Sequence, residues 1–383
     1  MRISIVTGFF LPIPTVLGGA TEKIWQRLSL EFAARGHRVN LFSRAWPAFA
    51  KTEAIGGVAH RRVEGADHSR FLAANLWHDS WWGLRVARVL PEADVVICNT
   101  VTLPVWLRRF RPQAGRVVAV VARMPKGHGR AYGRVDRLWA LSEAVAVRLR
   151  AENPRLAGRI APFPYPIDWR LHAQAAGGLL PRTPLTIGFA GRIHPEKGVE
   201  LLLSAAARLA ARSDLPPWRL RIVGPVDVRA GGGGEKWKSA LLGRYGSDLR
   251  TRLDWLAPEF DAEKLARHYG EMDVFCYPSL AEKGETFGLA VAEAMATGCA
   301  PVVSALACFS ELVRHGDTGL VFGQSGTGAD ARLADALASL LIDEPLRRSL
   351  ATRAQAHVRR YDFPAVADQA LADLERLCAH PAF

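Results

Sequence analysis

The sequence is poor in cysteine and has no long hydrophobic run. Its five cysteines are scattered, odd in number, and form no pair with metal-ligand spacing. This usage argues against a disulfide-rich scaffold and indicates a reducing, cytoplasmic compartment. No stretch approaches the roughly 20 uninterrupted apolar residues of a membrane-spanning helix. Pro12 and Pro14 interrupt the apolar N-terminal run, which we therefore interpret as a strand and its loop rather than a signal segment.

Acidic residues are also scarce relative to basic ones. The chain has 50 Lys and Arg against 37 Asp and Glu, which gives a formal net charge of +13. Such a surface favours phosphate-bearing partners. The sequence contains no helix-turn-helix, zinc-finger or RNA-recognition pattern, so we predict no nucleic-acid partner. A lipid-diphosphate acceptor fits the charge, as does peripheral contact with anionic lipid on the inner face of the cell membrane. The alternative is that the positive charge only keeps the protein soluble.

The pattern that is present is that of an α/β protein. A chain of 383 residues, 49% of them hydrophobic, is long enough for two domains. Apolar runs of strand length alternate with amphipathic segments of helix length, as in parallel sheets with crossover helices. The predicted helices include 21–35, 142–151 (with Ser142 as N-cap), 199–212 and 365–378. The predicted strands are 3–7, 39–42, 95–98, 117–121, 138–141, 185–190, 220–223, 273–277, 300–304 and 319–322.

A proline-rich stretch marks the predicted domain junction. Residues 161–168 contain three prolines within five positions, so the segment is stiff and cannot be helical. We therefore predict an N-terminal domain at 1–170, a C-terminal domain at 171–362 and a terminal helical segment at 363–383. The glycine run Gly231–Gly234 lacks phosphate-loop spacing, and we interpret it as a flexible surface loop.

Two glutamates near the end of the chain, Glu285 and Glu293, frame a glycine turn. We expect Glu285 in the loop after the strand 273–277, and Gly288 at the start of a helix that carries Glu293. Between the carboxylates lie the amides of Phe287, Gly288 and Leu289, which are unpaired donors at a helix N-terminus and favour an anion. A nucleotide-sugar, with hydroxyls at both ends and phosphates between them, matches this arrangement. A capped helix with two solvated glutamates is the alternative.

A second turn, after the strand 185–190, carries the cations Arg192 and Lys197. Turns at strand ends bind ligands in doubly wound domains. By itself, such a pair of cations is usually a solvated surface feature. Together with the Glu285 segment, it predicts a site for a diphosphate.

These motifs, in this order, resemble the retaining glycosyltransferases of family 4. Their fold, GT-B, has two Rossmann-like doubly wound domains that face a cleft, with a C-terminal helix that crosses back to the first domain. The resemblance covers nearly the whole length. It rests on the N-terminal strand, Gly18-Gly19, Gly191-Arg192, Lys197, the strand 273–277 with Ser279, the Glu285 and Glu293 segment, and residues 316–321.

The resemblance implies transfer of a hexose from a nucleotide-diphosphate sugar to a glycan or lipid-linked glycan, with retention and without metal or cofactor. It implies that Glu293 binds the ribose, that Glu285 binds the transferred sugar, and that Arg192 and Lys197 grip the diphosphate. Fixed cations near the leaving diphosphate would lower the barrier. The other substrate-binding positions that it implies are Gly18, Gly19, Gly191, Arg123, Thr286, Phe287, Gly288 and Leu289.

The sequence departs from the family pattern in the loop after the strand 117–121. A histidine there usually orients the sugar, but the expected position falls at Arg123-Met124. The nearest histidine, His128, is our candidate catalytic residue, with a surface-loop histidine as the alternative. Arg123 and Lys126 are candidates to contact the acceptor or the phosphate instead. Residues 164–168 also replace a turn common in the family, which affects the hinge rather than the chemistry.

Tryptophans lie beside arginines in the segments 71–85 and 103–111. Such segments suit a membrane-interface surface or an acceptor site that stacks on sugars, while helices whose tryptophans fill the core are the alternative. For the whole chain, the alternatives to a transferase are a non-catalytic nucleotide-sugar-binding protein and a sugar-nucleotide 2-epimerase. The sequence does not distinguish UDP from GDP, or glucose from mannose or galactose.

Overall fold

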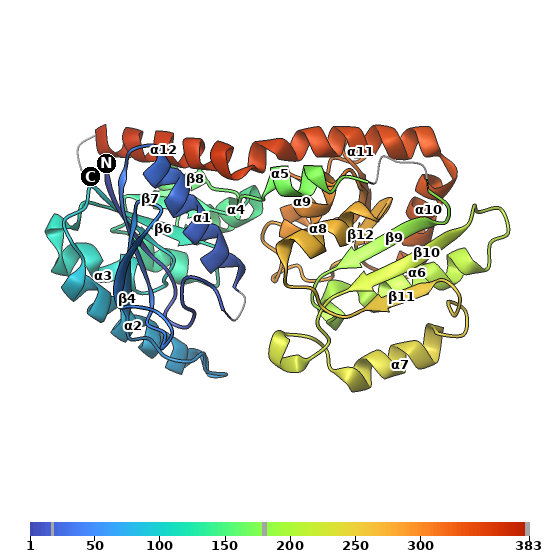
Figure 1. The fold of residues 1–383 in the computed structure, drawn as a ribbon, viewed down its shortest axis with the longest axis horizontal. Helices are drawn as coiled ribbons and strands as arrows, with labels where there is room; N and C mark the ends of the chain where they lie inside the picture. Colours follow the sequence, from blue (N-terminus) through green and yellow to red (C-terminus); the bar gives the residue numbers. More distant parts are fainter. Residues whose placement is uncertain (17–18, 178–181, 380–383) are drawn as a thin grey trace. The chain divides into compact units, whose positions relative to one another are not determined.

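The computed structural model describes residues 1–16, 19–177 and 182–379. Contacts between residues divide the chain into two compact units. The first unit contains Met1–Pro166 together with Phe363–Phe383, and the second contains Ile167–Asp362 (Figure 1). Each unit is built on its own mainly parallel sheet covered by helices, so the predicted α/β class is confirmed.

The first unit contains an eight-stranded sheet of order β3-β4-β2-β1-β5-β6-β7-β8. Only the β3–β4 pair is antiparallel among the strands described. The predicted strands are present with ends that differ by at most two residues, but β3, β4 and β8 were not predicted. The strands are β1 (Arg2–Val6), β2 (Arg38–Arg44), β3 (Thr52–Ile55), β4 (Val58–Val63), β5 (Val95–Cys98), β6 (Arg116–Val121), β7 (Arg137–Ala140) and β8 (Ile160–Pro162).

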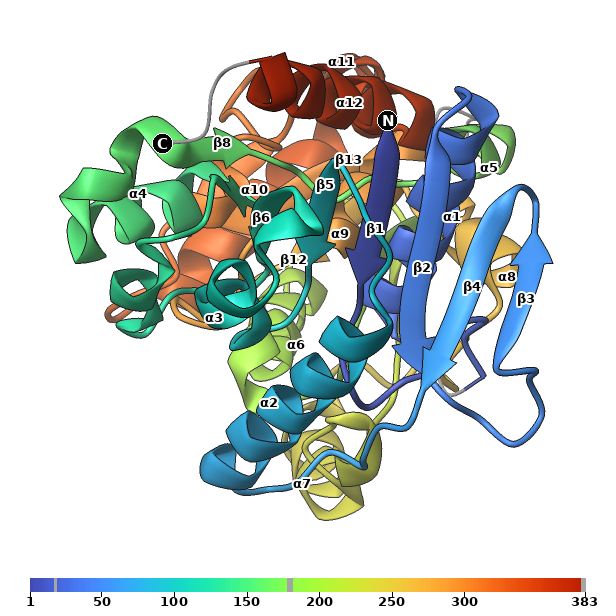
Figure 2. The ribbon, with the colours of Figure 1, turned by 90° about the vertical axis from the view of Figure 1, so that its left-hand side faces the viewer.

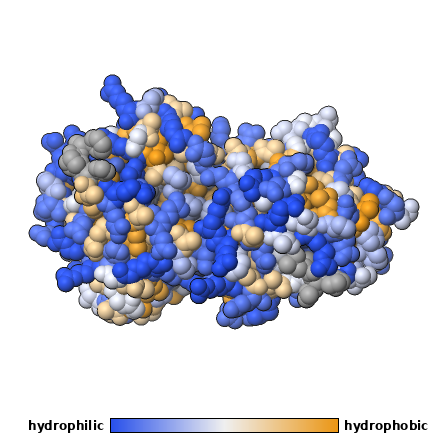
Figure 3. Space-filling view, turned by 90° about the horizontal axis from the view of Figure 1, so that it is seen from above, coloured by the Kyte–Doolittle hydropathy of each residue, from blue (hydrophilic) through white to orange (hydrophobic). Residues whose placement is uncertain are grey.

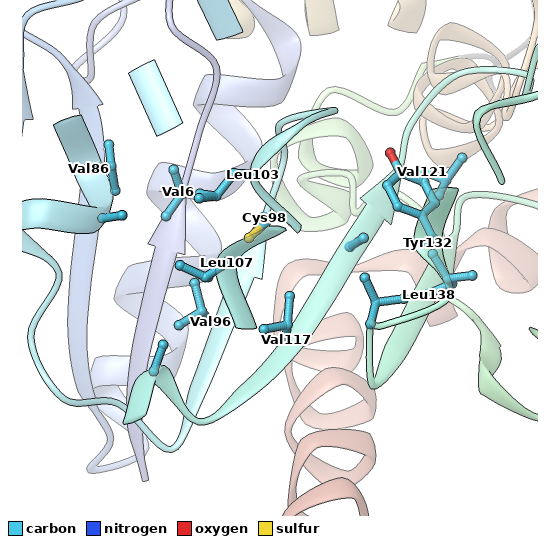
Figure 4. Packing of buried hydrophobic residues seen from close by; sticks show 14 of the residues in the cluster. Val6, Val86, Val96, Cys98, Leu103, Leu107, Val117, Val121, Tyr132 and Leu138 are labelled. Atoms are coloured by element: carbon cyan, nitrogen blue, oxygen red, sulfur yellow. The ribbon is translucent and has the colours of Figure 1, made fainter. Parts of the chain in front are cut away.

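One face of this sheet packs on three helices. Figure 4 shows Val6, Val96 and Val117 of the strands facing Val86 of α2 and Leu107 of α3 within one buried cluster. Figure 2 shows α2 and α3 lying side by side over this face. Ser142 caps α4 as predicted, with its hydroxyl oxygen accepting from the amide of Val145 at 3.4 Å. The helices are α2 (Leu72–Val89), α3 (Leu103–Phe110) and α4 (Glu143–Glu152).

The opposite face packs on α1 (Ala20–Ala34) and α12 (Phe363–Ala379). Side chains alternate along a strand, so Trp139 of β7 points to the opposite face from Leu138 and Ala140, which are buried on the first face. Its ring stacks on Phe163, with 4.3 Å between centroids, and lies parallel to Trp25 of α1. Its indole N–H donates to the buried carboxylate of Asp373 of α12 at 2.8 Å. The C-terminal helix is therefore part of the first unit, as the fold class predicts.

The second unit contains a six-stranded parallel sheet of order β11-β10-β9-β12-β13-β14. All the predicted strands are present, and β11 was not predicted. The strands are β9 (Leu185–Ala190), β10 (Trp218–Val223), β11 (Leu253–Leu256), β12 (Val274–Tyr277), β13 (Ala300–Ser304) and β14 (Leu320–Phe322). The helices are α5 (Trp169–Gln174), α6 (Val199–Ala210), α7 (Glu235–Tyr245), α8 (Ala262–Gly270), α9 (Leu289–Ala296), α10 (Ala329–Ile342) and α11 (Glu344–Val358).

The strand order reverses once in each sheet. In the first unit the reversal lies between β1 and β5, and in the second it lies between β9 and β12. The loops that follow two such strands run in opposite directions, and the crevice that they leave at the carboxyl ends is where doubly wound sheets bind ligands. The topology therefore points to one candidate site in each unit.

The surface of each unit is largely hydrophilic on the face that Figure 3 shows, with hydrophobic residues in small groups among polar ones. None of the helices in the described part of the chain has the length and apolar character that would let it cross a bilayer.

The Trp139 stack yields a prediction about stability. Trp139 is 1% exposed and joins β7 to α1 and α12, so Trp139→Ala should cost about 3–5 kcal/mol in the free energy of unfolding. The matched control is Trp77→Ala, because Trp77 is 63% exposed and its truncation should cost less than about 0.5 kcal/mol. Urea denaturation followed by circular dichroism measures both. Equal midpoints for the two variants would show that the stack does not hold the unit together.

Candidate functional site

An ion pair is buried at the crevice between β9 and β12. Lys197, at the end of the short 3-10 helix η4 (Pro195–Lys197) after β9, is 6% exposed, and Glu285, in the loop after β12, is 7% exposed. The Lys197 ammonium donates to Glu285 Oε1. The same oxygen accepts from the hydroxyls of Tyr277 at 3.2 Å and Ser279 at 3.1 Å. Three donors therefore converge on one carboxylate oxygen, which compensates for the loss of its hydration.

Tyr277 contacts both members of the pair. Lys197 Nζ lies 5.8 Å from the centroid of the Tyr277 ring, within reach of a cation–π attraction. Burial, and then the charge of Glu285, raise the pKa of Tyr277 well above its ordinary value. The phenol therefore stays protonated and remains a donor to the carboxylate at physiological pH.

A close backbone approach brings the pair together. Gly198, which follows Lys197, has φ of 70°, and a Cβ there would lie 1.9 Å from the carbonyl oxygen of Pro278. The Leu280 amide then donates to the Glu196 carbonyl at 2.8 Å, which joins the loop after β12 to η4. A side chain at position 198 would force the two loops apart, so this glycine fixes the distance between the ammonium and the carboxylate.

The structure places Lys197 differently from the position that the sequence suggested. The sequence motif indicates a cation on an open turn facing a phosphate. Lys197 instead ends a 3-10 helix, is almost fully buried, and is paired with Glu285, which is 88 residues away in the chain. Its removal should therefore affect the stability of the unit.

The segment between the two glutamates forms the predicted helix N-terminus. Gly288 is the N-cap of α9 with φ of 94°, and within the described part of the chain the amides of Phe287, Gly288 and Leu289 have no acceptor. Phe287 is buried, and its ring lies 5.3 Å from that of Tyr361. Thr286 and Leu289 are half-buried. The free amides and the positive end of the helix dipole make this segment suitable for an anion.

Glu293 lies within α9, whereas Glu285 lies in the loop before this helix. It is half-buried, and its Oε2 accepts from the Tyr269 hydroxyl at 3.2 Å. Burial, and then the charge of Glu293, raise the pKa of Tyr269 well above its ordinary value, so this phenol is also a fixed donor.

Arg192 is the exposed cation of the site. Gly191 and Arg192 directly follow β9, and the Arg192 side chain is 45% exposed. It pairs with Glu196 at 2.7 Å and donates to the carbonyl oxygen of Gly231 at 3.1 Å. One exposed and one buried cation therefore lie on the turn after β9.

The glycine run is tied to this turn, whereas the sequence suggested a flexible loop. The Gly233 amide donates to the Ile193 carbonyl at 2.7 Å, and the Gly234 amide donates to the Val226 carbonyl at 2.9 Å. Gly232 is buried, and a Cβ there would lie 2.1 Å from the Val226 carbonyl oxygen. The run therefore forms a wall beside Arg192 that only glycine can build.

The first unit contains a cavity of about 510 Å³ at its own strand-order reversal. The cavity is lined by the turns after β1, β5 and β6 and by parts of α1 and α2. The indole N–H of Trp82 donates to the Thr7 carbonyl at 3.0 Å, which fastens α2 to the end of β1. The polar lining residues are Thr21, Glu22, His68, Ser69, Arg70, Asn75, Asp79, Asn99, Thr100 and Arg123.

Two carboxylates in the lining are buried. Glu22, in the first turn of α1, is 3% exposed, and Asp79 of α2 is 5% exposed. Burial raises the pKa of both carboxyl groups above their ordinary values. Asp79 accepts from the amide and the hydroxyl of Thr102 at 2.8 and 2.6 Å. A Cβ at Gly19 would lie 2.5 Å from Glu22 Oε2, so this glycine admits the carboxylate.

The lining also contains polar atoms that lack partners. The side-chain oxygen and nitrogen of Asn99 and the hydroxyl of Thr100 are buried, and none of these atoms has a hydrogen-bond partner among the described residues. Both residues directly follow β5. Because an unpaired buried amide is costly, a polar ligand that supplies a donor and an acceptor would be stabilised here.

Of the site residues predicted in the first unit, Arg123 lines this cavity. Its side chain is exposed, and Gly19 is the N-cap of α1. Gly18 lies outside the described residues. His128 begins the 3-10 helix η2 (His128–Tyr132), but its side chain is also outside what the structure describes. Glu22, Asp79 and Asn99 were not predicted as site residues, although Asn99 directly follows a predicted strand and Glu22 follows the Gly18-Gly19 turn.

The tryptophans of α2 lie partly in the core and partly on the surface, the two environments that the sequence left open. Trp82 is buried in the core, whereas Trp77 and Trp81 are 63% and 41% exposed. In residues 1–16, 19–177 and 182–379, no group of three or more His, Cys, Asp and Glu side chains has an arrangement that could hold a metal ion.

Comparison with known proteins finds a family match in the second unit. A family model described as Glycosyl transferases group 1 matches residues 173–357, which is most of that unit. The second unit is therefore similar to the glycosyl transferases group 1 family. Phosphatidyl-myo-inositol mannosyltransferase of Mycobacterium leprae is 27% identical to this glycosyltransferase over 96% of this chain and 95% of its own length.

Solved structures agree on the fold. Sucrose-phosphate synthase of Thermosynechococcus elongatus superposes on this glycosyltransferase with a TM-score of 0.79 at 20% identity, over 99% of both chains. The Anabaena protein HepE, solved with UDP and glucose, superposes with a TM-score of 0.73 at 18% identity, over 98% of this chain and 100% of its own. The fold is GT-B, as the sequence resemblance implied.

The buried pair predicts a specific pattern of stability. Lys197→Ala leaves the Glu285 carboxylate buried without its counter-charge, so unfolding should become easier by about 3–5 kcal/mol. In Lys197→Ala/Glu285→Gln the uncompensated charge is gone, and much of the loss should be recovered. Urea denaturation of both single variants and the double variant tests this coupling, with the exposed Lys283→Ala as control. Additive effects of the two substitutions would contradict a coupled pair.

The buried carboxyl of Glu22 predicts a pH-dependent effect. Its pKa is raised in the folded protein, so its contribution to stability is fully present below the unfolded-state pKa and is lost as pH rises through the folded-state pKa. Glu22→Gln should therefore raise the melting temperature at neutral pH, and the gain should shrink at acidic pH. Melting curves from pH 4 to 8 measure it, with the exposed Glu64→Gln as control. A gain that does not depend on pH would contradict a desolvated carboxylate.

Proposed function

We propose that this glycosyltransferase moves a hexose from a nucleotide-diphosphate sugar to a glycan or lipid-linked acceptor, with retention of configuration and without a metal ion. The observation that carries the proposal is the grouping of Lys197, Arg192 and the free amides before α9 at the strand-order reversal of the second unit. Two cations and a helix N-terminus suit a diphosphate whose negative charge increases as the sugar leaves.

The buried pair gives Lys197 and Glu285 linked roles. Without donor, Glu285 holds the ammonium in place. When a diphosphate binds, Lys197 gains a second anionic partner, while the hydroxyls of Tyr277 and Ser279 continue to donate to the Glu285 carboxylate. Among the described residues, Glu285 Oε2 takes no part in this network, and it is the atom that we assign to the sugar hydroxyls. The loss of one fixed donor at a developing oxyanion typically costs about 10²–10³ in rate.

Glu293 is proposed to bind the ribose. Glu293 lies in α9, and Glu285 lies in the loop before that helix. The Tyr269 hydroxyl orients the Glu293 carboxylate through a hydrogen bond of 3.2 Å. The two glutamates would therefore recognise opposite ends of the donor. That HepE was solved with UDP and glucose supports a nucleotide-sugar as donor.

The cavity of the first unit is proposed to receive the acceptor. Its volume of about 510 Å³ is within the usual range of small-molecule sites. Carboxylates and an unpaired amide are suitable partners for the hydroxyl groups of a sugar or polyol ring. The name of the Mycobacterium leprae relative, a phosphatidyl-myo-inositol mannosyltransferase, supports a polyol headgroup on a lipid.

Exposed apolar residues next to this cavity support a lipid-linked acceptor. Leu72 and Leu76 line the cavity and are 74% and 38% exposed, and the neighbouring Phe71 and Trp77 are 59% and 63% exposed. Apolar groups at the rim of a polar cavity suit a headgroup whose chain remains in a bilayer. We therefore propose that the enzyme contacts the membrane peripherally.

The test of the proposal is product analysis. The enzyme is incubated with UDP- and GDP-hexoses and with lipid-linked or free polyol acceptors, in the presence and absence of EDTA. We expect a glycosidic product whose anomeric configuration, measured by NMR, matches that of the donor, at the same rate in EDTA. An inverted product, a requirement for an added divalent ion, or epimerisation of the donor without acceptor would each contradict the proposal.

Isosteric variants separate the roles of the glutamates. Glu285→Gln should lower turnover by about 10² or more without weakening the binding of the bare nucleoside diphosphate, because Lys197 remains available to the phosphates. Glu293→Gln should weaken that binding, since the ribose is present with or without the sugar. Steady-state kinetics and calorimetry give both values. Equal losses of nucleotide affinity in the two variants would contradict separate roles.

A further inference from the structure

The first unit has a second concave region, separate from the proposed acceptor cavity. One hollow of about 440 Å³ is lined by Gly133 and four arginines, and a neighbouring hollow of about 630 Å³ shares Gly133 and Arg159 with it. Neither hollow shares a lining residue with the cavity of 510 Å³. We call the two hollows together the arginine groove, and its arginines are Arg108, Arg109, Arg130, Arg134, Arg155 and Arg159.

The groove lies near the amino ends of the strands. Arg134 lies shortly before β7, Arg159 is the last residue of the 3-10 helix η3 (Pro154–Arg159) directly before β8, and Arg109 is in the last turn of α3. The acceptor cavity is instead lined by residues after the carboxyl ends of β1, β5 and β6. The groove is therefore not part of the crevice where the transfer reaction is proposed.

The positive charge of the groove is largely uncompensated. Among the described residues, the side chains of Arg109, Arg130, Arg134 and Arg155 have no hydrogen-bond or ion-pair partner, and all four are exposed. The neighbouring carboxylate, Glu152, already accepts from the amides of Gly127 and Gly129 and pairs with Arg148. Asp136, which pairs with Arg108 at 2.7 Å, is buried and shared with Arg116.

Two of the arginines are held in place by hydrogen bonds to other residues of the first unit. Arg108 is oriented by Asp136, and Arg159 donates to the carbonyl oxygens of Gly133 and Val135 at 3.0 Å. Fixed guanidinium groups beside exposed ones that have no partner suit the oxygens of a phosphate group, which arginine binds through paired N–H donors. Isolated exposed arginines are usually only solvated, but like charges gathered around a concave surface repel one another unless an anion lies between them.

Aromatic residues beside the groove favour one source of phosphate. Phe110, next to Arg109, is 64% exposed, and its ring lies 5.6 Å from that of the half-buried Trp106. An exposed aromatic ring next to arginines is typical of surfaces that rest at the interface of an anionic bilayer. We propose that the arginine groove binds the phosphate groups of anionic lipid headgroups and holds the first unit on a membrane surface. The proposal does not depend on the transfer reaction.

Vesicle binding tests the groove. The full-length protein is titrated with vesicles of phosphatidylcholine containing phosphatidylglycerol, and the partition coefficient is measured by co-sedimentation. Arg109→Gln/Arg134→Gln removes two groove charges and should weaken binding by about thirtyfold, at roughly a fivefold factor for each basic residue near the surface. The matched control, Arg250→Gln/Arg267→Gln, removes two exposed charges from the second unit, neither of which forms a salt bridge with a described residue, and should change binding little.

Each remaining outcome either supports or overturns the proposal. Vesicles of phosphatidylcholine alone should bind parent and groove variant equally weakly, and melting curves should show both double variants to be folded. Equal losses in the groove and control variants would reduce the effect to net charge and overturn the assignment. The same holds if inorganic pyrophosphate binds the parent but not the groove variant while vesicle binding is unchanged, since the groove would then serve a soluble anion. Preference for single-stranded RNA over vesicles at equal salt would also overturn it.

Discussion

The buried ion pair between Lys197 and Glu285 is the interaction on which the site in the second unit depends. Two charges taken out of water are tolerated only when they meet in good geometry and when their remaining hydrogen-bonding capacity is satisfied. Here the hydroxyls of Tyr277 and Ser279 supply that compensation, and Gly198 allows the two loops to approach closely enough for the pair to form. Burial of the pair also explains why a residue expected to bind substrate is tied to the stability of the unit.

The two units use the same topology but manage buried charge differently. In the second unit a carboxylate is neutralised by an ammonium, and the cation of that pair is the one that suits a phosphate. In the first unit the carboxylates of Glu22 and Asp79 are buried, and neither has a cation partner among the described residues. Burial raises the pKa values of both groups. Together with the unpaired amide of Asn99, these groups make the cavity costly when empty and favourable to a ligand with several hydroxyls.

The strands and helix ends could be predicted because local patterns determine them. The apolar runs that end at Ala190 and Tyr277 are buried parallel strands. Gly288 and Ser142 are N-caps, and glycine and serine are residue types that commonly begin helices. The pairing of Lys197 with Glu285 could not be predicted, because it joins residues 88 positions apart through a backbone contact at Gly198. The glycine run Gly231–Gly234 looked flexible because its order comes from backbone hydrogen bonds that composition does not reveal.

The cavity of the first unit was not predicted, for a related reason. Acidic residues on helices are normally exposed, so no sequence pattern indicated that Glu22 and Asp79 line a cavity. The arginine groove gathers residues from α3, η2, η3 and the segment before β7, and only the fold brings these together. What composition did indicate was an excess of positive charge, without its location.

Calorimetric titration of a nucleoside diphosphate into two variants tests the central claim most directly. The comparison is between Glu285→Gln and Lys197→Ala/Glu285→Gln, so that neither protein contains a buried, uncompensated carboxylate. If Lys197 grips the diphosphate, the double variant should bind it about tenfold or more weakly than the single variant, as expected for the loss of a charged hydrogen bond. Equal affinities would mean that the buried lysine is a structural residue and that the diphosphate binds elsewhere.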